Sequence, residues 1–561
     1  MTAKTKTDRW RRMLSHGYFA PELPPCFVSD DIARFRKSIF DGIASLPQIN
    51  QRPNFHRYIT EPSWFYFPRF GREDRRHGVP NPIAYLLLAK TIADNYVQLR
   101  RAARRSDLSA SPPIFDWSGP RALVRPNVDL RDDFRMNLSS RREEYVAADI
   151  RAFFHSIYTH SIPWAIHGKA WSKTNRGIQH VGNLLDLLCR NLQDGQTIGL
   201  PVGPDASRLL AELVASAMDE QLRQKLNTSG RDSSRYIDDY TISTADGQTG
   251  ETMIAALRQV AAHFELELNS GKSTLVSTST RHTTGWKQAV RTVVPRGNPD
   301  TASMQLFFYE VGRLCTEHTD INVEKFAFAN ARSSFVRTDG WSSVQGMLIN
   351  AYRRNSTLVS FLVEVFILRQ VQHSDVDLAD LKEFLDHRIP VLAQANRSGE
   401  IIWFLFLAMR LDIVISNKAA SSLVQIDNAM VALLLAVANS RRQVSGHVDL
   451  SGWNASLTPD GLRGQMWLYA YEAARLGLAP GFTTAFIEQD PYFSLLLARG
   501  VSFFNLNNGF TSINATLRSR REDNVRTSRL RADFLDDFDF DTEDYDDDDF
   551  EDFDFEDSLD Y

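Results

Sequence analysis

The pattern of hydrophobic and polar positions changes at about residue 296. Before it, an apolar run at 145–149 and aromatic or β-branched residues around 236–242 predict strands, and 209–218 is apolar at helical spacing. After it, amphipathic helices follow one another, and they are expected at Gln305–Cys315, Leu358–Gln372, Ile401–Ile415, Ile426–Asn439 and Gly464–Leu476. The chain therefore reads as a mixed α+β part followed by an all-α part.

The helices after residue 296 are separated by polar or Gly/Pro-bearing breaks such as 296–299 and 458–461. A stacked helical array is the simplest architecture for such a run, although the sequence has no strict repeat period. The most apolar stretch, 401–409, stops at Arg410 and Asp412. It is shorter than the roughly 20 residues that span a membrane, so we expect a buried helix and no membrane partner.

Composition agrees with a large multidomain protein. The 561 residues are too many for one core, and 43% of them are hydrophobic. The three cysteines are far apart and show no metal-ligand spacing, which favours a reducing cytoplasm: Cys26, Cys189 and Cys315. The basic N-terminus, residues 1–13, has no apolar segment after it, so we expect no signal peptide.

The net charge of −5 hides a strong asymmetry. Residues 533–561 contain 17 Asp or Glu and no Lys or Arg, so removing them leaves a body of +12. We expect the body to bind polyanions, with a polyanion attached to it. An arginine cluster precedes the tail and either tracks phosphates or pairs with the following acids: Arg518, Arg520, Arg521, Arg526, Arg529 and Arg531.

The most specific chemical signal is the adjacent pair Asp238 and Asp239, between Tyr236-Ile237 and the β-branched or aromatic residues at 240–242. Two acids at a strand-to-strand turn do not both ionise cheaply unless a cation lies between them. The alternative is an ordinary hairpin turn, in which Asp is common.

A third acid, Asp149, ends the apolar run 145–149, which predicts a buried strand that delivers a carboxylate at its end. Two-metal phosphoryl or nucleotidyl transfer requires carboxylates from separate strands, because two cations must be bridged and neutralised. Asp149 with Asp238 and Asp239 meets that requirement.

Two further segments complete the set. A glycine-rich stretch at 199–207 is followed by a helix expected to open at about Ser207, an arrangement that lets backbone approach a ligand. Residues 266–269 then give a strand-turn signal with one cation, Lys272, near its end.

In this order, the four segments resemble the palm motifs of reverse transcriptases over roughly residues 60–295. Three further stretches resemble the abortive-infection and related defence-associated bacterial reverse transcriptases of the AbiK-type group: 67–69, 77–82 with Tyr85, and 156–160. That family joins a reverse-transcriptase core to a helical-repeat domain in place of a thumb.

The resemblance implies a role for each matching residue. Two Mg²⁺ or Mn²⁺ ions would be held by Asp149, Ile150, Asp238 and Asp239. Lys272 would protonate departing pyrophosphate; Phe154 would exclude a ribose 2′-hydroxyl; Ile150, Gly203 and Ser207 would contact the nascent pair. Arg69 and Arg72, with Arg75 and Arg76, would clamp a triphosphate. A solvated cation at Lys272, and a surface basic run at the arginines, are equally consistent with the sequence.

The chain departs from templated reverse transcriptases at two positions in the glycine-rich stretch. Val202 stands where they usually have Gln, and Arg208 stands where they usually have Pro. Template handling is therefore expected to differ.

The implied domains are an N-terminal segment bracing the fingers (1–60), fingers and palm (61–295), a helical-repeat-like domain (296–532) and the tail (533–561). The implied function is metal-dependent DNA synthesis in antiphage defence, protein-primed or template-independent, by a homo-oligomer. The implied partners are dNTPs, RNA or single-stranded DNA, and a noncoding RNA. Two alternatives remain: a templated reverse transcriptase of the retron or group II intron kind, and a catalytically silent nucleic-acid-binding regulator or scaffold.

The tail alternates Phe with acids, a pattern that cannot bury a core against its own repulsion, so disorder is the expectation. A sharper hypothesis is nucleic-acid mimicry, with carboxylates imitating phosphates and Phe rings imitating bases. A third is that Tyr545 or Tyr561 supplies a priming hydroxyl.

Overall fold

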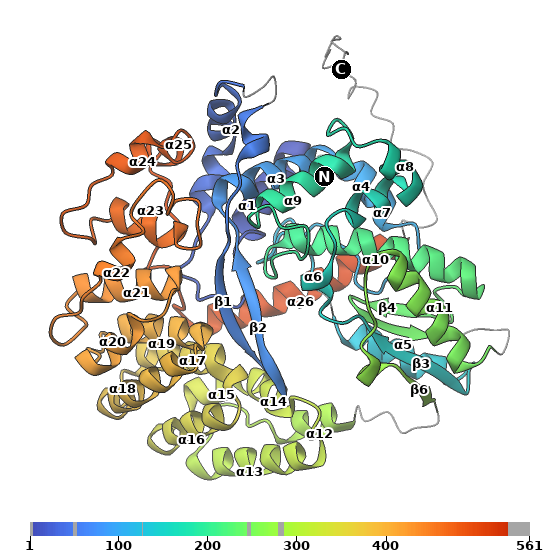
Figure 1. The fold of residues 1–561 in the computed structure, drawn as a ribbon. Coiled ribbons are helices and arrows are strands. Elements are labelled where there is room, and N and C mark those ends of the chain that lie inside the picture. Colours follow the sequence, from blue (N-terminus) through green and yellow to red (C-terminus); the bar gives the residue numbers. More distant parts are fainter. Residues whose placement is uncertain (1–3, 49–52, 126, 244–247, 279–284, 537–561) are drawn as a thin grey trace.

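The computed structural model describes residues 4–48, 53–125, 127–243, 248–278 and 285–536. Helices and two small sheets share these residues (Figure 1), so the mixed α+β class expected from the sequence is confirmed. Figure 1 shows the four-stranded sheet on one side, an arc of helices on the other, and a long two-stranded hairpin between them.

The strands are β1 (Ser63–Arg69), β2 (Arg72–Val79), β3 (Glu144–Asp149), β4 (Ser234–Tyr236), β5 (Asp239–Ile242) and β6 (Thr274–Ser277). β1 and β2 form one antiparallel hairpin, and the others form an antiparallel sheet in the order β4-β5-β3-β6. The strand at 145–149 and the hairpin around 238 are therefore confirmed. The strand expected at 266–269 is wrong, because only Leu268 makes a bridge, to Ile150, before a 3-10 turn, η2 (Ser270–Lys272).

The helices up to residue 293 fall into groups. They are α1 (Lys6–His16), α2 (Asp30–Ala44), η1 (Asn54–Arg57), α3 (Pro82–Asp94), α4 (Tyr96–Ala103), α5 (Asp129–Leu138), α6 (Phe153–Ser156), α7 (Ser161–His167), α8 (Lys169–Thr174), α9 (Val181–Asn191), α10 (Asp205–Leu226), α11 (Gly250–His263) and α12 (Gly285–Val293). α1, α2, α3 and α9 pack together beside the hairpin, and α12 packs on the two helices that follow it in the chain. α10 is buried along most of its length and packs on α7, α11 and α4. It begins two residues before the predicted Ser207, directly after Pro204.

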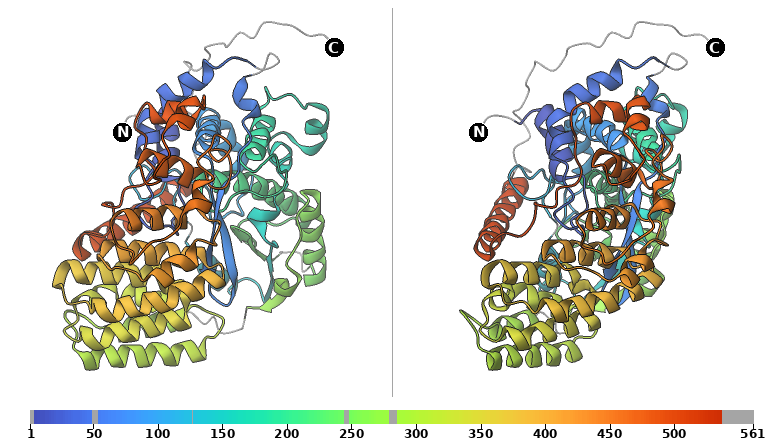
Figure 2. Two further views of the ribbon diagram at one scale, coloured as in Figure 1. Left: turned by 60° about the vertical axis from the view of Figure 1, so that its left-hand side comes forward. Right: turned by 90° about the vertical axis from the view of Figure 1, so that its left-hand side faces the viewer.

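The second half of the chain is helical. Its elements are α13 (Thr301–Glu317), α14 (Val323–Asn330), α15 (Arg332–Arg337), α16 (Trp341–Arg354), η3 (Ser356–Leu358), α17 (Val359–His373), α18 (Leu378–Gln394), α19 (Ser398–Arg410), α20 (Asn417–Leu423), α21 (Ala429–Ser440), α22 (Ser451–Asn454), α23 (Trp467–Arg475), α24 (Ala485–Gln489) and α25 (Phe493–Leu497). α15, α17, α19, α21 and α23 each pack on the next of this series, which makes a stacked array (Figures 1 and 2).

The apolar segment 401–409 lies in α19, where every one of these residues is buried in the centre of the array. α19 ends at Arg410, so the predicted continuation to Ile415 is wrong. The chain turns there through Asp412, whose φ is +53°. In the described part of the chain, no helix is long and apolar enough to cross a membrane.

The hairpin β1–β2 is fixed to the helical array. The backbone N–H of Tyr66 donates to Ser398 Oγ (2.9 Å), and Asn428 Nδ2 donates to the carbonyl of Trp64 (2.7 Å). At Gly399, a Cβ atom would lie 2.4 Å from the carbonyl oxygen of Tyr66, so only glycine permits this approach. The position of the hairpin relative to the sheet is thus set by the array.

The C-terminal part of the chain packs against the N-terminal helices. α2 packs on α25, and two backbone hydrogen bonds join the segments: Val28 N–H to the carbonyl of Phe503 (3.0 Å) and Asn505 N–H to that of Cys26 (2.8 Å). α26 (Ile513–Asp536) then runs along the side of the molecule (Figure 2). α26 continues to Asp536, so it includes the first four residues of the acidic segment that begins at residue 533. The rest of the tail, 537–561, with Tyr545 and Tyr561, lies outside the described residues.

Candidate active site

The larger sheet brings the three predicted acids together at one end of its two central strands, β3 and β5. Asp149, the last residue of β3, is the cross-strand partner of Asp239, the first residue of β5. Asp238 lies in the turn just before it, and its carbonyl accepts a hydrogen bond from Ile150 N–H (3.2 Å). Like charges directly opposite each other in a sheet are destabilising. The folded chain therefore holds its acids where a bound cation would relieve them.

The turn that carries Asp238 is strained. Tyr236 pairs with Asp239, so the loop between β4 and β5 has two residues, Ile237 and Asp238. Ile237 has a φ of +59°, a region that β-branched residues rarely adopt. Such strain amounts to about 1–3 kcal/mol and persists only where the surroundings enforce it.

A buried network enforces this conformation. The N–H of Ile237 donates to Ser111 Oγ (2.9 Å), and its carbonyl accepts from Arg235 Nη1 (2.8 Å). Arg235 has no exposed surface and also donates to Asp219 (2.9 Å) and Glu212 (2.7 Å) of α10. Burial alone would lower the pKa of Arg235, but the two carboxylates outweigh it and raise the pKa above its usual value. The turn is thus tied through one arginine to the largest helix beneath the sheet.

A central cavity of about 610 Å³ opens beside these acids. Asp149 and Asp238 line it, together with Ile150, Phe154 and residues of the hairpin tip. Its volume lies in the range of cavities that hold small ligands. Asp239 is not part of this lining.

Asp239 is instead paired with a helix. Arg131 of α5 donates from Nη1 to Asp239 Oδ2 (2.9 Å). The next arginine on the same helix face, Arg135, donates to Thr241 Oγ1 (2.9 Å), two residues along β5. Asp239 thus faces α5 rather than the cavity. Among the described residues, no group of three or more His, Cys, Asp or Glu side chains converges as a metal site.

Asp238 is in an unfavourable setting for its own charge. Burial, Asp149 and Asp239 together raise the pKa of Asp238 to about 6, against a usual value of 3.8. Arg75 opposes the shift without cancelling it. A divalent cation near Asp238 would restore its ionised form, so the electrostatics of this residue fit a metal ligand.

Asp149 has two neighbours from the segment after α11. Lys272 Nζ lies 2.7 Å from Asp149 Oδ2, and Asn269 Nδ2 donates to the same oxygen (3.2 Å). The N–H of Asn269 also donates to the Asp149 carbonyl (2.7 Å). The position of Lys272, predicted only as a cation near a strand end, is therefore beside Asp149 and inside the cavity lining.

Four arginines of the hairpin line the other side of the cavity: Arg69, Arg72, Arg75 and Arg76. Within the described residues, none of the four forms an ion pair, although Arg76 stacks on Trp64 at 4.1 Å. Burial, with Arg75 and Arg72 nearby, lowers the pKa of Arg69. Clustered arginines without carboxylate partners are the pattern expected for binding a polyanionic group.

The two phenylalanines after Asp149 have different surroundings. Both line the cavity, but Phe153 is only 3% exposed and belongs to the core, whereas Phe154 is half-buried. The adjacent Ala152, with a φ of +46°, turns the chain into α6 and separates the two side chains. The sequence alone did not distinguish these roles from a shared core role.

Gly203 and Ser207 have packing roles in the structure. Gly203 has a φ of +127°, and a Cβ there would lie 2.6 Å from the Cβ of Ala20. Ser207 is 5% exposed in the first turns of α10. Neither belongs to the cavity lining, but Val202 of the same loop does, and its carbonyl accepts from Gly78 N–H of β2 (3.0 Å).

Sequence reasoning missed several residues that shape the site: Asn269, Ser111, Arg131, Arg235 and Glu212. Asn269 lay inside a segment already singled out, so its polar side chain beside Lys272 was an available signal. The other four come from α5, α10, β4 and a loop distant in sequence, and no local pattern marks them.

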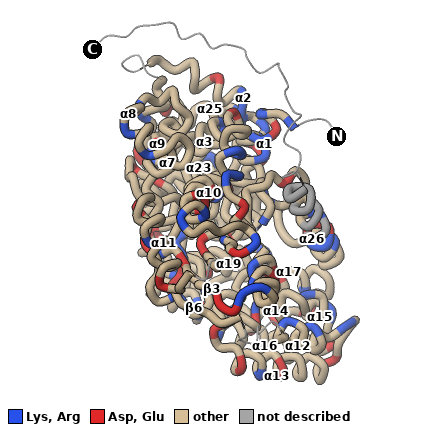
Figure 3. The backbone as a smooth tube through the Cα atoms, turned by 90° about the vertical axis from the view of Figure 1, so that its right-hand side faces the viewer, with Lys and Arg blue, Asp and Glu red and all other residues tan. Residues whose placement is uncertain are grey.

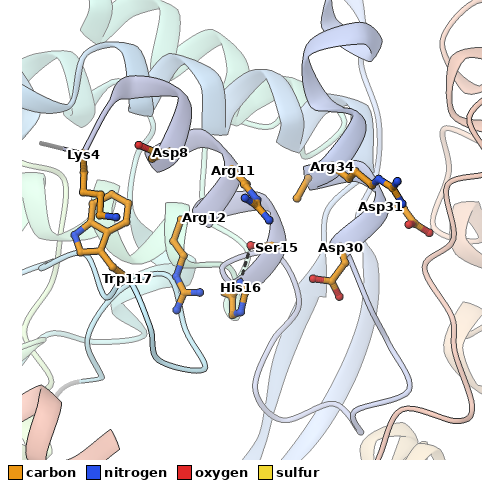
Figure 4. A pocket seen from close by; sticks show the side chains of 11 residues that line it. Lys4, Asp8, Arg11, Arg12, Ser15, His16, Asp30, Asp31, Arg34 and Trp117 are labelled. Atoms are coloured by element: carbon orange, nitrogen blue, oxygen red, sulfur yellow. Dashed lines mark hydrogen bonds between the residues drawn. The ribbon is translucent and has the colours of Figure 1, made fainter. Parts of the chain in front are cut away.

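A second cavity, of about 590 Å³, lies between α1 and α2 (Figure 4). Charges of both signs line it, including Arg11, Arg12, Asp30 and Asp31. Burial and nearby arginines lower the pKa of His16 to about 4, so this side chain is neutral at pH 7. The mixed charges of this cavity do not select one kind of ligand.

No protein-family model matches the chain, and no curated protein is significantly similar to it. The function must therefore be inferred from the residues and their geometry.

Proposed function

We propose that this chain is a metal-dependent nucleotidyltransferase of the reverse-transcriptase kind, which adds deoxynucleoside monophosphates to a hydroxyl group. The observation that carries the proposal is the central cavity. Asp149 and Asp238 meet there at one sheet edge, opposite hairpin arginines that form no ion pair in the described part of the chain. Acids on one side and cations on the other suit a metal-bound triphosphate.

The residues present fit Mg²⁺ or Mn²⁺. Mg²⁺ is commonly held by one or two carboxylates together with substrate phosphates, so Asp149 and Asp238 suffice as side-chain ligands. Ile150 lines the same cavity, and its carbonyl would offer a further oxygen. Asp239, paired with Arg131 outside the cavity, would add to the negative potential at Asp238. Bound ions would activate the attacking hydroxyl and neutralise charge on the triphosphate.

The protein's own residues would then bind and orient the nucleotide. Arg69 and Arg72 would hold the triphosphate, and Phe154 would pack against the sugar and exclude a 2′-hydroxyl. Lys272, an ammonium donor beside Asp149, would give a proton to the departing pyrophosphate. The new bond joins the hydroxyl oxygen to the α-phosphorus, and the bond from that phosphorus to the bridging oxygen breaks.

The resemblance of the sequence motifs extends the proposal. It implies that 61–295 act as fingers and palm and that the helical array replaces a thumb. It also implies cytoplasmic antiphage defence by a homo-oligomer that acts on dNTPs and on RNA or single-stranded DNA. Protein priming or template-independent synthesis belongs to the same proposal.

The test incubates the purified chain with Mg²⁺ or Mn²⁺ and each labelled dNTP, without template or primer, followed by a denaturing protein gel. Label that migrates with the polypeptide and is released by protease supports protein-primed synthesis. Label that appears only when a primer and an RNA template are added supports a conventional templated reverse transcriptase. Absence of label under both conditions contradicts the proposal.

A second candidate, a silent nucleic-acid-binding scaffold, is favoured by one contact. Lys272 Nζ lies 2.7 Å from Asp149 Oδ2, so the ammonium can balance the charge of this carboxylate. A scaffold requires no ionised acids, so Asp238→Asn would leave its biological activity intact. An enzyme would lose its activity in the same variant while still binding nucleic acid.

A further inference from the structure

The hairpin β1–β2 also borders a third cavity, on the side away from the central cavity and between the hairpin tip and the helical array. This outer groove, of about 430 Å³, is lined by Glu22, Phe67, Pro68, Arg69, Phe70, Arg72, Arg75, His77, Asp320, Asn322, Lys325 and Thr357. Arg69, Arg72 and Arg75 line the central cavity as well. The outer groove and the central cavity are therefore adjacent, and three arginines are common to both.

The outer groove is positively charged. Arg69, Arg72, Arg75 and Lys325 supply four cations, and in the residues that the structure describes none of these side chains forms a hydrogen bond or ion pair. Burial lowers the pKa of His77 to about 4, so it is neutral at pH 7. The two acids, Glu22 and Asp320, leave the cations in excess.

Aromatic side chains accompany these cations. Phe70, in the turn of the hairpin between Arg69 and Arg72, is 37% exposed. Phe67, directly across from Arg75 in the hairpin, is only 7% exposed and belongs to the core, so Phe70 is the more accessible ring. Cations beside an exposed ring are typical of surfaces that bind single-stranded nucleic acid, because phosphates contact the cations and a base stacks on the ring.

The opposite wall belongs to the helical array. Lys325 lies on α14 and is exposed, and Thr357 lies in η3, which packs on β1. A ligand in the outer groove thus contacts both halves of the chain. A single nucleotide has no need of a second cavity across the hairpin, whereas a strand has successive phosphates that can occupy both.

We propose that the outer groove binds the backbone of single-stranded nucleic acid whose end lies in the central cavity. Arg75 contacts a phosphate where the strand passes the hairpin tip, and Lys325 contacts a phosphate beyond it, while Arg69 and Arg72 hold the triphosphate. The inference rests on the proposed function, because it takes the central cavity as the place of nucleotide addition. DNA and RNA share the phosphate backbone that this groove recognises.

The test measures fluorescence anisotropy of labelled oligo(dT) and oligo(rU), about 4 and about 16 nucleotides long, with the full chain. We expect Lys325→Glu to weaken binding of the longer strand about tenfold and to lower its salt dependence, with a smaller effect on the shorter strand. Lys418→Glu on α20 is the matched control, because Lys418 is an exposed lysine outside both cavities. The oligonucleotide, oligo(dT) or oligo(rU), that binds with the higher affinity identifies the strand as DNA or RNA.

Two results separate the possible failures. If Lys325→Glu and Lys418→Glu bind the longer strand equally well, the outer groove is not a strand-binding site, whether or not the chain incorporates nucleotides. If binding of the longer strand depends on Lys325 but no nucleotide is ever incorporated, the outer groove is a strand-binding site and the proposed function is wrong. A photo-crosslinking residue at position 325 provides the second readout. Labelled oligonucleotide should crosslink there, and a lack of crosslinking would contradict strand binding in the outer groove.

Discussion

Asp238 is held where its own negative charge is disfavoured. An unfolded chain ionises this carboxyl near pH 4, whereas in the folded chain the pKa is about 6. Below pH 4 the carboxyl is protonated in both states, and the stability that its raised pKa provides is lost as the pH rises through 6. At pH 8 the ionised carboxylate therefore lowers the free energy of unfolding, by at most about 3 kcal/mol.

Asp238→Asn should stabilise the protein when divalent metal is absent. At about pH 8 in EDTA we expect the free energy of unfolding to rise by about 1–3 kcal/mol, and the gain to vanish towards pH 4. Mg²⁺ should raise the Tm of the wild type and not that of the variant. Urea unfolding and thermal melts measure both.

Asp427→Asn, at an exposed carboxylate, is the control and should change neither quantity. A variant Asp238→Asn that is less stable at pH 8 in EDTA would contradict the electrostatic account of this residue.

At the residue scale, the sequence predicted the acids but not their partners. Asp149 and Asp238 were predictable, because an apolar strand and a short turn are local patterns. The ion pair between Asp239 and Arg131 was not predictable, since it depends on how α5 lies beside β5. The sequence predicts close ligand approach at Gly203, but its contact with Ala20, far earlier in the chain, explains the glycine.

At the element scale, the β4–β5 turn depends on one buried arginine. Arg235→Met leaves Glu212 and Asp219 buried without their counter-charge, so we expect a loss of about 3–5 kcal/mol in the free energy of unfolding. Arg235→Lys keeps the charge but not the fork of donors that also reaches Ile237. For a folded Arg235→Lys variant we expect a higher Mg²⁺ requirement for incorporation, because the turn positions Asp238.

Arg223→Met, which breaks an exposed ion pair with Glu220, is the control and should change stability by less than about 1 kcal/mol. An unchanged Mg²⁺ requirement in Arg235→Lys would mean that the network does not position the acid.

The tip of the β1–β2 hairpin should determine nucleotide affinity. Removing one charge-assisted contact to a phosphate costs about 1.5–3 kcal/mol, so Arg69→Ala and Arg72→Ala should each raise the KM for dNTPs about tenfold or more. Steady-state incorporation measures this. Arg101→Ala, on the exposed face of α4, should leave the KM unchanged, and equal KM values for all three variants would exclude a role in triphosphate binding.

Helical periodicity predicted α13, α17, α19, α21 and α23, because each buries an apolar face, but not the shorter or more polar helices between them. It failed where local geometry ends an element: α19 stops before Asp412, and the segment 266–269 makes a single bridge, at Leu268, before a 3-10 turn. These endings depend on backbone conformations and long-range contacts that apolar spacing does not encode.

At the scale of the whole molecule, α26 joins the two halves of the chain. Arg520 pairs with the buried Glu364 of α17 (3.2 Å), and Arg526 pairs with the buried Asp116 beyond α4 (2.9 Å). Basic residues follow one another along this helix in Figure 3. The sequence revealed the arginine cluster and left two roles open, and for Arg520 and Arg526 the structure shows carboxylate partners within the body.

The double variant Arg520→Ala and Arg526→Ala should release α26. Each removed arginine leaves a buried carboxylate with fewer donors, so we expect a loss of about 1–3 kcal/mol for each, confined to the attachment of this helix. Hydrogen exchange should speed up along 513–536 and stay unchanged in α10. Arg521→Ala, at an exposed position of the same helix, is the control; if it accelerates exchange as much as the double variant, the two ion pairs do not hold α26.

The central claim is that Asp149 and Asp238 act together in nucleotide transfer. The most direct measurement compares labelled dNTP incorporation by the wild type, Asp149→Asn, Asp238→Asn and the control Asp427→Asn, at saturating Mg²⁺ and equal protein concentration. We predict a loss of at least about a thousandfold in both acid variants, full activity in the control, and unchanged binding of nucleic acid throughout. Incorporation by Asp149→Asn or Asp238→Asn at the wild-type rate would contradict the account.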